Sequence, residues 1–202
     1  MILVRRKKVD EEYSVKLVAY TIILFISSFF APFVIVASYQ SVIYFSRSYW
    51  FFATPFSAYI TFMGGMLYIS VIMTIYLIFF RQRWEGGKMQ WKTGLFLLVS
   101  LPAFMLSMTN YYYMDEKGIH YNGLTGFAEK EYKWNDMSNV QIIYRNHQGT
   151  TGFFQYKFEM TDGRNIVLPF NDKLSENKYR IEAKIKMLKL PVHDNFENPI
   201  VD

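Results

Sequence analysis

The side chains that could carry out chemistry are few and lie far apart along the chain. The three histidines are His120, His147 and His193, and none has the i, i+4 or short-loop spacing that metal sites use. Cysteine is absent, which excludes thiolate catalysis, disulfides and cysteine-ligated metals. We therefore expect no catalytic, cofactor-binding or metal-ligating residues, no cofactor, and a protein that is not an enzyme.

Two short segments resemble functional loops but have simpler explanations. Gly149-Thr150-Thr151-Gly152 lacks the lysine and spacing of a phosphate-binding loop, so it is interpreted as an ordinary loop. Asp162 precedes Gly163, and this dipeptide favours a type I′ hairpin turn over acid–base chemistry.

The elements that must position these residues fall into an apolar part and a mixed part. The 64 residues from Leu17 to Phe80 carry one charge, Arg47, and the 21 residues from Thr93 to Tyr113 carry none. A membrane-spanning helix needs about 20 apolar residues. The sequence therefore predicts a membrane α-helical part with three transmembrane helices, at about 17–39, 58–80 and 93–113.

Interfacial residues and a proline refine this prediction. Pro32 should kink the first span, which is tolerated in membranes. The segment from Ser46 to Phe52 and the run Tyr111-Tyr112-Tyr113 have the Tyr and Trp content of a bilayer interface.

The distribution of charge predicts an orientation. Residues 1–92 hold ten Lys/Arg and four acids, a net charge of +6, so the remainder of the +5 chain is close to neutral. Cations concentrate in the N-terminal flank and in the loop from Arg81 to Lys92, which should be cytoplasmic. Three spans then place the C-terminal domain outside the plasma membrane. Because the basic surplus flanks the spans, we expect no nucleic-acid binding.

Two alternatives remain open at this stage. Helices at 17–36, 38–57 and 60–80 would give four spans and a cytoplasmic C-terminal domain, with Arg47 near mid-bilayer at a cost of about 2.5–3.5 kcal/mol. A signal peptide cleaved near Ile35-Val36-Ala37 is the other, although its apolar stretch is longer than such peptides need.

After Tyr113 the pattern changes to short strands separated by turns. Strands are expected at Gly118–Tyr121 and Phe127–Trp134, and a third contains Val140, Ile142 and Tyr144 and ends at 146–149. The clearest is 154–160, where apolar and polar residues alternate. A fifth, 166–168, stops at Pro169.

An amphipathic helix should follow the strands. Leu174, Ile181, Ile185 and Leu188 form one apolar stripe, and Pro191 stands where a helix would stop. The opposite face is basic. It could contact anionic lipid headgroups, but such faces are more often simply solvated.

The order of these elements resembles bacterial pleckstrin-homology-like (PH-like) domains. The resemblance rests on Gly118-Ile119, on the segment from Tyr132 to Met137, and on the segment from Asp162 to Ile166. It covers under half of the chain, and its motifs have low specificity. It implies an α+β domain in which a partly open antiparallel β-barrel is closed by a C-terminal helix, and a binding role. It does not imply phosphoinositide binding, because the turn from Asn122 to Gly126 has no cation.

The predicted protein is therefore a bacterial multi-pass membrane protein with an interaction domain. Its parts are a basic flank (1–16), a transmembrane domain (17–113), a PH-like soluble domain (114–190) and a tail (191–202). The expected role is a non-catalytic scaffold, sensor or protective factor. Expected partners are the lipid bilayer and either another protein or a second copy of the chain. The alternative is an accessory or oligomeric subunit of a transporter or channel.

Overall fold

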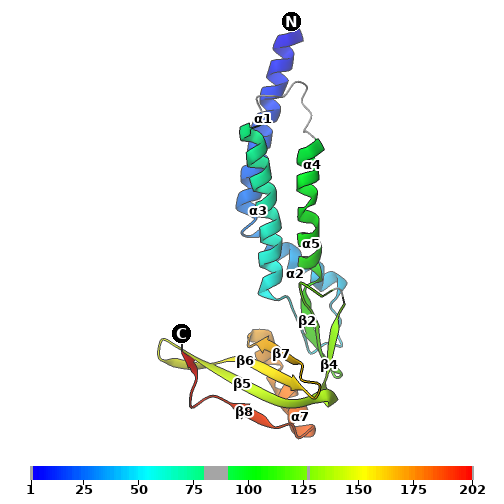
Figure 1. The fold of residues 1–202 in the computed structure, drawn as a ribbon, viewed down its shortest axis with the longest axis vertical. Helices are drawn as coiled ribbons and strands as arrows, with labels where there is room; N and C mark the ends of the chain where they lie inside the picture. The colour runs from blue at the N-terminus through cyan, green and yellow to red at the C-terminus, as the bar shows by residue number, and fades with distance from the viewer. Residues whose placement is uncertain (1, 80–90, 127, 202) are drawn as a thin grey trace. The chain divides into compact units, whose positions relative to one another are not determined.

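The computed structural model describes residues 2–79, 91–126 and 128–201, and the chain divides into two compact units (Figure 1). We call them the helical unit and the β unit and describe each by itself. The helical unit comprises Met1–Tyr44, Thr54–Tyr111 and Gly123–Thr125, and the β unit comprises Phe45–Ala53, Tyr112–Asn122 and Gly126–Asp202.

The first expected span is two helices. Helix α1 (Ile2–Ser27) and helix α2 (Ala31–Ile43) are separated by a short turn, and the apolar part of α1 meets α2 at an angle of 69°. Pro32 lies at the start of α2, where its missing N–H has no intrahelical partner to lose. The proline therefore begins a new helix instead of kinking a continuous one.

The rest of the helical unit contains helices α3 (Phe56–Phe79), α4 (Trp91–Leu98) and α5 (Ser100–Thr109). Helix α3 packs against α1 and α5 (Figure 1). The alternative helix at 38–57 is wrong, because α2 ends at Ile43 and a strand begins at Phe51.

The expectation of three transmembrane helices is also wrong. Among the described residues, only Phe56–Ile78 is long and apolar enough to span a membrane by itself. A second candidate exists only if the bent pair Ser14–Ser27 and Ala31–Ile43 counts as one span, and Thr93–Thr109 is a shorter apolar helix. The third expected span is cut short because the chain becomes extended at Asn110 and continues as a strand through Tyr111–Met114.

A buried glutamine joins three segments of the helical unit. The Gln40 amide nitrogen donates to the carbonyl oxygens of Ser107 (3.1 Å), Met108 (3.2 Å) and Asn110 (2.9 Å), at the C-terminal end of α5. Its amide oxygen accepts a bond of 2.7 Å from the Thr54 hydroxyl. Gln40 thus satisfies carbonyl groups that a helix end leaves without partners. The apolar core beside it consists of Val36, Ala58, Phe62 and Met66.

The strands form two sheets. The first has the order β1-β2-β3-β4, and the second has the order β7-β6-β5-β8, with β9 also paired to β5. In the first sheet the strands are β1 (Phe51–Ala53), β2 (Tyr111–Met114), β3 (Gly118–Asn122) and β4 (Lys130–Lys133). In the second they are β5 (Met137–His147), β6 (Thr150–Met160), β7 (Asn165–Pro169), β8 (Val192–Asp194) and β9 (Ile200–Val201).

The aromatic segments expected at a membrane interface form strands of the first sheet. Strand β1 pairs antiparallel with β2, with Phe51 opposite Met114 and Ala53 opposite Tyr112. Trp50 is buried and stacks on Trp134, with ring centroids 5.6 Å apart. Aromatic residues suit a buried strand as well as an interface, so composition alone did not separate the two.

A lysine closes the outer edge of β1. The Lys173 ammonium group donates a hydrogen bond of 2.8 Å to the carbonyl oxygen of Phe52. An unpaired carbonyl on an edge strand is a template for pairing with other chains, and a lysine there opposes such pairing.

The second sheet has two hairpins, and the turn type of the second differs from expectation. Gln148 and Gly149 both have positive φ, as a type I′ turn requires, and they connect β5 to β6. Between β6 and β7 only Gly163 has positive φ, so Asp162-Gly163 does not form the expected type I′ turn. The Gly163 N–H instead bonds to the Met160 carbonyl, within the four residues that separate β6 from β7.

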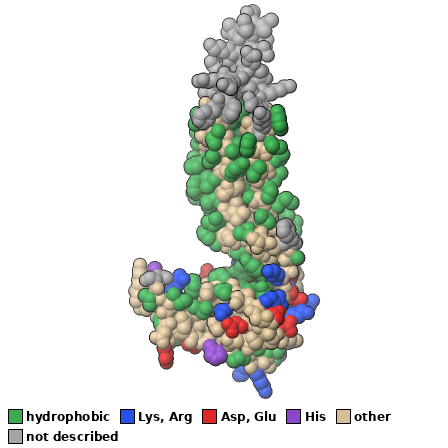
Figure 2. All heavy atoms as spheres, in the orientation of Figure 1, with side chains coloured by type: hydrophobic (Ala, Val, Ile, Leu, Met, Phe, Trp, Pro, Cys, Tyr) green, Lys and Arg blue, Asp and Glu red, His purple; other side chains and the backbone are tan. Residues whose placement is uncertain are grey.

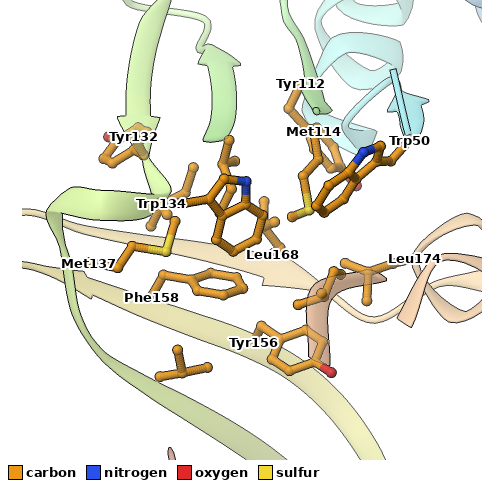
Figure 3. Packing of buried hydrophobic residues seen from close by; sticks show 14 of the residues in the cluster. Trp50, Tyr112, Met114, Tyr132, Trp134, Met137, Tyr156, Phe158, Leu168 and Leu174 are labelled. Atoms are coloured by element: carbon orange, nitrogen blue, oxygen red, sulfur yellow. The ribbon is translucent and has the colours of Figure 1, made fainter. Parts of the chain in front are cut away.

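Two short helices pack on the sheets. These are α6 (Asp172–Glu176) and α7 (Lys178–Met187), and they bury the expected stripe residues Leu174, Ile181 and Ile185. Figure 3 shows Trp134, Tyr156 and Phe158 converging with Trp50 and Leu174 in this core. Large aromatic rings of this kind bury about 150–250 Å² each.

The expected single, partly open barrel is wrong as well. The strands form two sheets because a 3₁₀ turn at Trp134–Asp136 redirects the chain between β4 and β5. The expected tail, 191–202, adds strands β8 and β9 to the second sheet. Two expectations fall partly outside the described residues: the basic loop from Arg81 to Lys92, and the strand start at Phe127.

Candidate functional site

The turn between β2 and β3 is built by Asp115. Its carboxylate oxygen Oδ1 accepts the backbone N–H groups of Lys117 (2.8 Å) and Gly118 (3.1 Å). Its backbone oxygen accepts the indole N–H of Trp134 at 2.9 Å. Gly118 is required here because a Cβ atom would overlap the Tyr132 carbonyl oxygen of the neighbouring strand. The turn therefore holds Glu116 and Lys117 in a fixed position.

On one side of this turn lies a buried histidine between two carboxylates. His120 is 6% exposed, with Nδ1 3.1 Å from Glu129 Oε1 and Nε2 3.3 Å from Asp115 Oδ1. Its ring stacks on Tyr113 with centroids 4.4 Å apart, and Tyr113 stacks on Tyr49 at 3.9 Å. Two strands and the segment before β1 thus contribute to one aromatic stack.

Tyr113 also contacts Glu129 through its hydroxyl, which donates a hydrogen bond of 2.8 Å to Oε1. Burial raises the pKa of the Tyr113 phenol, and the Glu129 carboxylate raises this pKa further. The phenol therefore stays protonated as a donor. Since both His120 ring nitrogens and the Tyr113 hydroxyl already have carboxylate partners, this cluster suits fixing the sheet better than binding a substrate.

Residues of the turn also line a cleft of about 520 Å³, which we call the mixed-charge cleft. Lys184 lies 3.1 Å from Glu116, and Lys133 lies 4.0 Å from Glu131. The Lys117 ammonium group forms no ion pair with any residue that the structure describes. The lining consists of Glu116, Lys117, Glu131, Lys133, Trp134, Asn135, Lys184 and Met187.

The chemistry of the mixed-charge cleft is ionic. Ammonium groups and carboxylates at its rim can exchange their partners for charged groups of another molecule. Lining residues come from the β2–β3 turn, β4, the 3₁₀ turn and α7, so the fold positions them independently. Three lysines against two glutamates leave an excess positive charge, which favours an acidic ligand.

A second hollow, of about 470 Å³, lies at the end of the β5–β6 hairpin. It is lined by residues of both strands, including Arg145, His147 and Thr150. The Arg145 guanidinium lies 3.7 Å from the centroid of the Phe154 ring, which is a cation–π contact. This hollow is open and formed by a hairpin end, so it is a weaker candidate than the mixed-charge cleft.

The structure does not bring the three histidines together. His120 is in β3, His147 ends β5, and His193 is in β8 with Nδ1 3.0 Å from Asn139 Oδ1. In the part of the chain that the structure describes, no group of three or more histidine, cysteine, aspartate or glutamate side chains could hold a metal ion. The segment from Gly149 to Gly152 lies in the hairpin turn and the start of β6, and Asp162 lies in a turn.

Local sequence patterns did not predict the His120 cluster or the mixed-charge cleft. Asp115 and Glu129 are five and nine residues from His120. Only the pairing of β3 with β4 brings Glu129, which directly precedes β4, close to His120. The available signal was Asp115 itself, because aspartate often accepts the backbone N–H two residues on in an Asx turn, here that of Lys117. Comparison with known proteins adds no relative: no family model matches the chain, and no curated protein or solved structure matches it.

Replacing Asp115 by Ala should loosen the turn that supports both features. The Lys117 and Gly118 N–H groups would lose their acceptor, at a cost of roughly 1–3 kcal/mol. Asp162→Ala is the matched control, because the Asp162 carboxylate accepts the Arg164 N–H in an exposed turn. Its removal should lower the free energy of unfolding by only a few tenths of the amount lost in Asp115→Ala. Denaturant unfolding of the full chain in detergent, followed by tryptophan fluorescence, measures both. Equal losses in the two variants would contradict this assignment.

Proposed function

We propose that this protein is a non-catalytic membrane protein whose helical unit is embedded in lipid and whose β unit binds another protein through the mixed-charge cleft. The observation that supports it best is the surface of the helical unit. Large apolar side chains point outward along α1, α2, α3, α4 and α5. Examples are Ile23, Val34, Val71, Phe96 and Met105.

Figure 2 shows hydrophobic side chains over the visible face of the helical unit, while lysine, arginine and acidic side chains appear on the β unit. Monomeric soluble proteins rarely expose apolar patches larger than a few hundred Å². Lipid removes the cost of exposing this surface, so a bilayer is the environment that fits it. Helix α3, and the bent pair of α1 and α2, supply the candidate crossings.

The pairing of β1 with β2 supports one location for the β unit. Because these strands share a sheet, the segment Phe45–Ala53 and the residues after Tyr111 lie on the same side of any membrane. The chain from Thr54 to Tyr111 therefore contributes no net crossing, and if α3 crosses, the chain must return to the same side through α4 and α5. With a basic, cytoplasmic N-terminal flank, a crossing by the bent pair places the β unit outside the cell.

Binding, as opposed to catalysis, is supported by the kinds of side chain in the cleft. Its charged groups are ammonium and carboxylate groups in exposed or half-buried positions, which suits recognition of an acidic protein segment. The absence of enzymatic activity and the resemblance to bacterial PH-like membrane proteins stay predictions.

Two valine substitutions test the embedding. Val71 in α3 is 52% exposed and Val167 in β7 is 43% exposed, so each accepts lysine without steric conflict. Lysine in a spanning helix costs about 2.5–3.5 kcal/mol. Val71→Lys should reduce the fraction of protein that resists alkaline extraction from membranes, and Val167→Lys should leave it unchanged. A wild-type chain that stays monodisperse in buffer without detergent would contradict the proposal.

Single cysteines test the location, since the native chain has none. Ser48→Cys and Thr150→Cys place thiols at exposed positions of the β unit. Both should react with a membrane-impermeant maleimide on intact cells. Labelling of one without the other would contradict the β1–β2 pairing, and labelling of both only after permeabilisation would place the β unit in the cytoplasm.

Charge reversal tests the cleft. The probe is a fluorescent decapeptide of glutamates, measured by anisotropy with the full chain in detergent. Lys117→Glu combined with Lys133→Glu should weaken binding about 5- to 30-fold, because each exposed charge contributes up to about 1 kcal/mol. Lys130→Glu with Lys186→Glu makes the same change of net charge at positions outside the cleft. Equal weakening by both pairs would show that only net charge matters and would contradict a specific site.

A further inference from the structure

The C-terminal tail occupies the edge of β5 as two very short strands. Strand β8 pairs parallel with β5 at Val140–Val192, Gln141–His193 and Ile142–Asp194, and β9 pairs parallel with it at Arg145 and Asn146. All five residues of β8 and β9 are exposed. The tail therefore contributes backbone pairing to the sheet but little side-chain burial.

A single asparagine continues the ladder between these two strands. The Asn195 side-chain oxygen accepts the Tyr144 N–H at 2.6 Å, and its nitrogen donates to the Tyr144 carbonyl at 3.2 Å. Phe196 packs edge-on against the Tyr144 ring, with centroids 5.1 Å apart, yet it remains 58% exposed. These contacts depend on the edge of β5 and not on which copy of the chain supplies the tail.

The hinge before the tail is short and strained. Only four residues separate the last residue of α7, Met187, from Val192. Lys189 has a φ of 53°, the left-handed region that follows a helix end and that glycine prefers. The Leu190 N–H bonds back to the Ile185 carbonyl at 3.1 Å, so the reversal of the chain depends on Lys189 keeping this conformation. Pro191 then limits the conformations available to the connection.

We propose that two copies of this chain exchange their tails, so that β8 and β9 of one copy pair with β5 of the other in the same register. Exchange preserves every contact between tail and β5, because the two copies are identical. It also allows the hinge to extend, which releases the left-handed conformation of Lys189. Short, strained hinges favour exchange for this reason. A second copy is the occupant that fits, because the segment seated on the edge is the chain's own.

Disulfide trapping tests the exchange with the full chain in detergent. Gln141 and His193 are register partners in β5 and β8, and neither is a core residue. Chains carrying Gln141→Cys are mixed with chains carrying His193→Cys, incubated at high concentration and oxidised mildly in air. We expect a disulfide-linked heterodimer, identified by mass, whose yield rises with protein concentration.

A second cysteine pair supplies the control. Lys157 and Val167 are register partners in β6 and β7. These strands form a hairpin that stays within one copy in the proposed exchange. Mixed Lys157→Cys and Val167→Cys chains measure random collision, and a heterodimer yield for the tail pair no greater than this background would overturn the proposal.

Lys189→Gly tests the hinge as the source of exchange. Glycine adopts the left-handed conformation without strain, so the unexchanged single chain becomes more stable. The yield of trapped heterodimer should therefore fall about fivefold or more. A chain carrying both Gln141→Cys and His193→Cys should form an internal disulfide, which shows that the register is intact. An unchanged heterodimer yield in Lys189→Gly would overturn hinge strain as the driving force.

Discussion

The antiparallel pairing of β1 with β2 is the constraint on which the β unit depends. It joins Phe51–Ala53 to Tyr112–Met114 although most of the helical unit separates them in sequence. The pairing brings Trp50 onto Trp134, and Trp134 in turn contacts Phe158 edge-on with centroids 6.0 Å apart. Trp134 also donates to the Asp115 carbonyl, so the same core residue supports the turn that shapes the mixed-charge cleft. Pairing, core and cleft are therefore parts of one connected arrangement.

The second sheet and its helices were the part best predicted from sequence, because their signals are local. Alternation from Phe154 to Met160 gave β6, and the stripe through Leu174, Ile181 and Ile185 gave the buried face of α6 and α7. Local signals failed where distant segments decide the structure. An apolar run that includes Phe51 and Phe52 has the same composition in a lipid-facing helix as in a buried strand, and only the partner strand distinguishes them.

Local sequence signals also failed to predict the turns and the candidate site, although the segments involved are closer together in sequence. Asp162-Gly163 has the favoured type I′ sequence, yet the turn of that kind forms at Gln148-Gly149, where only two residues connect the strands. Pro32 was expected inside a span and instead begins α2. The His120 cluster could not be predicted because its carboxylates meet the ring only after β3 and β4 pair. Exposed strands such as β8 leave almost no hydrophobic pattern to detect.

The distance in sequence between β1 and its partners also has a consequence in time. The 58 residues from Thr54 to Tyr111 must be synthesised before β2 appears, which takes about 3–12 s at about 5–20 residues per second. Lys173, which closes the outer edge of β1, is made later still. During translation the segment Trp50-Phe51-Phe52 therefore has both strand edges unpaired until β2 has been made, and an unpaired edge is a template for pairing with other chains.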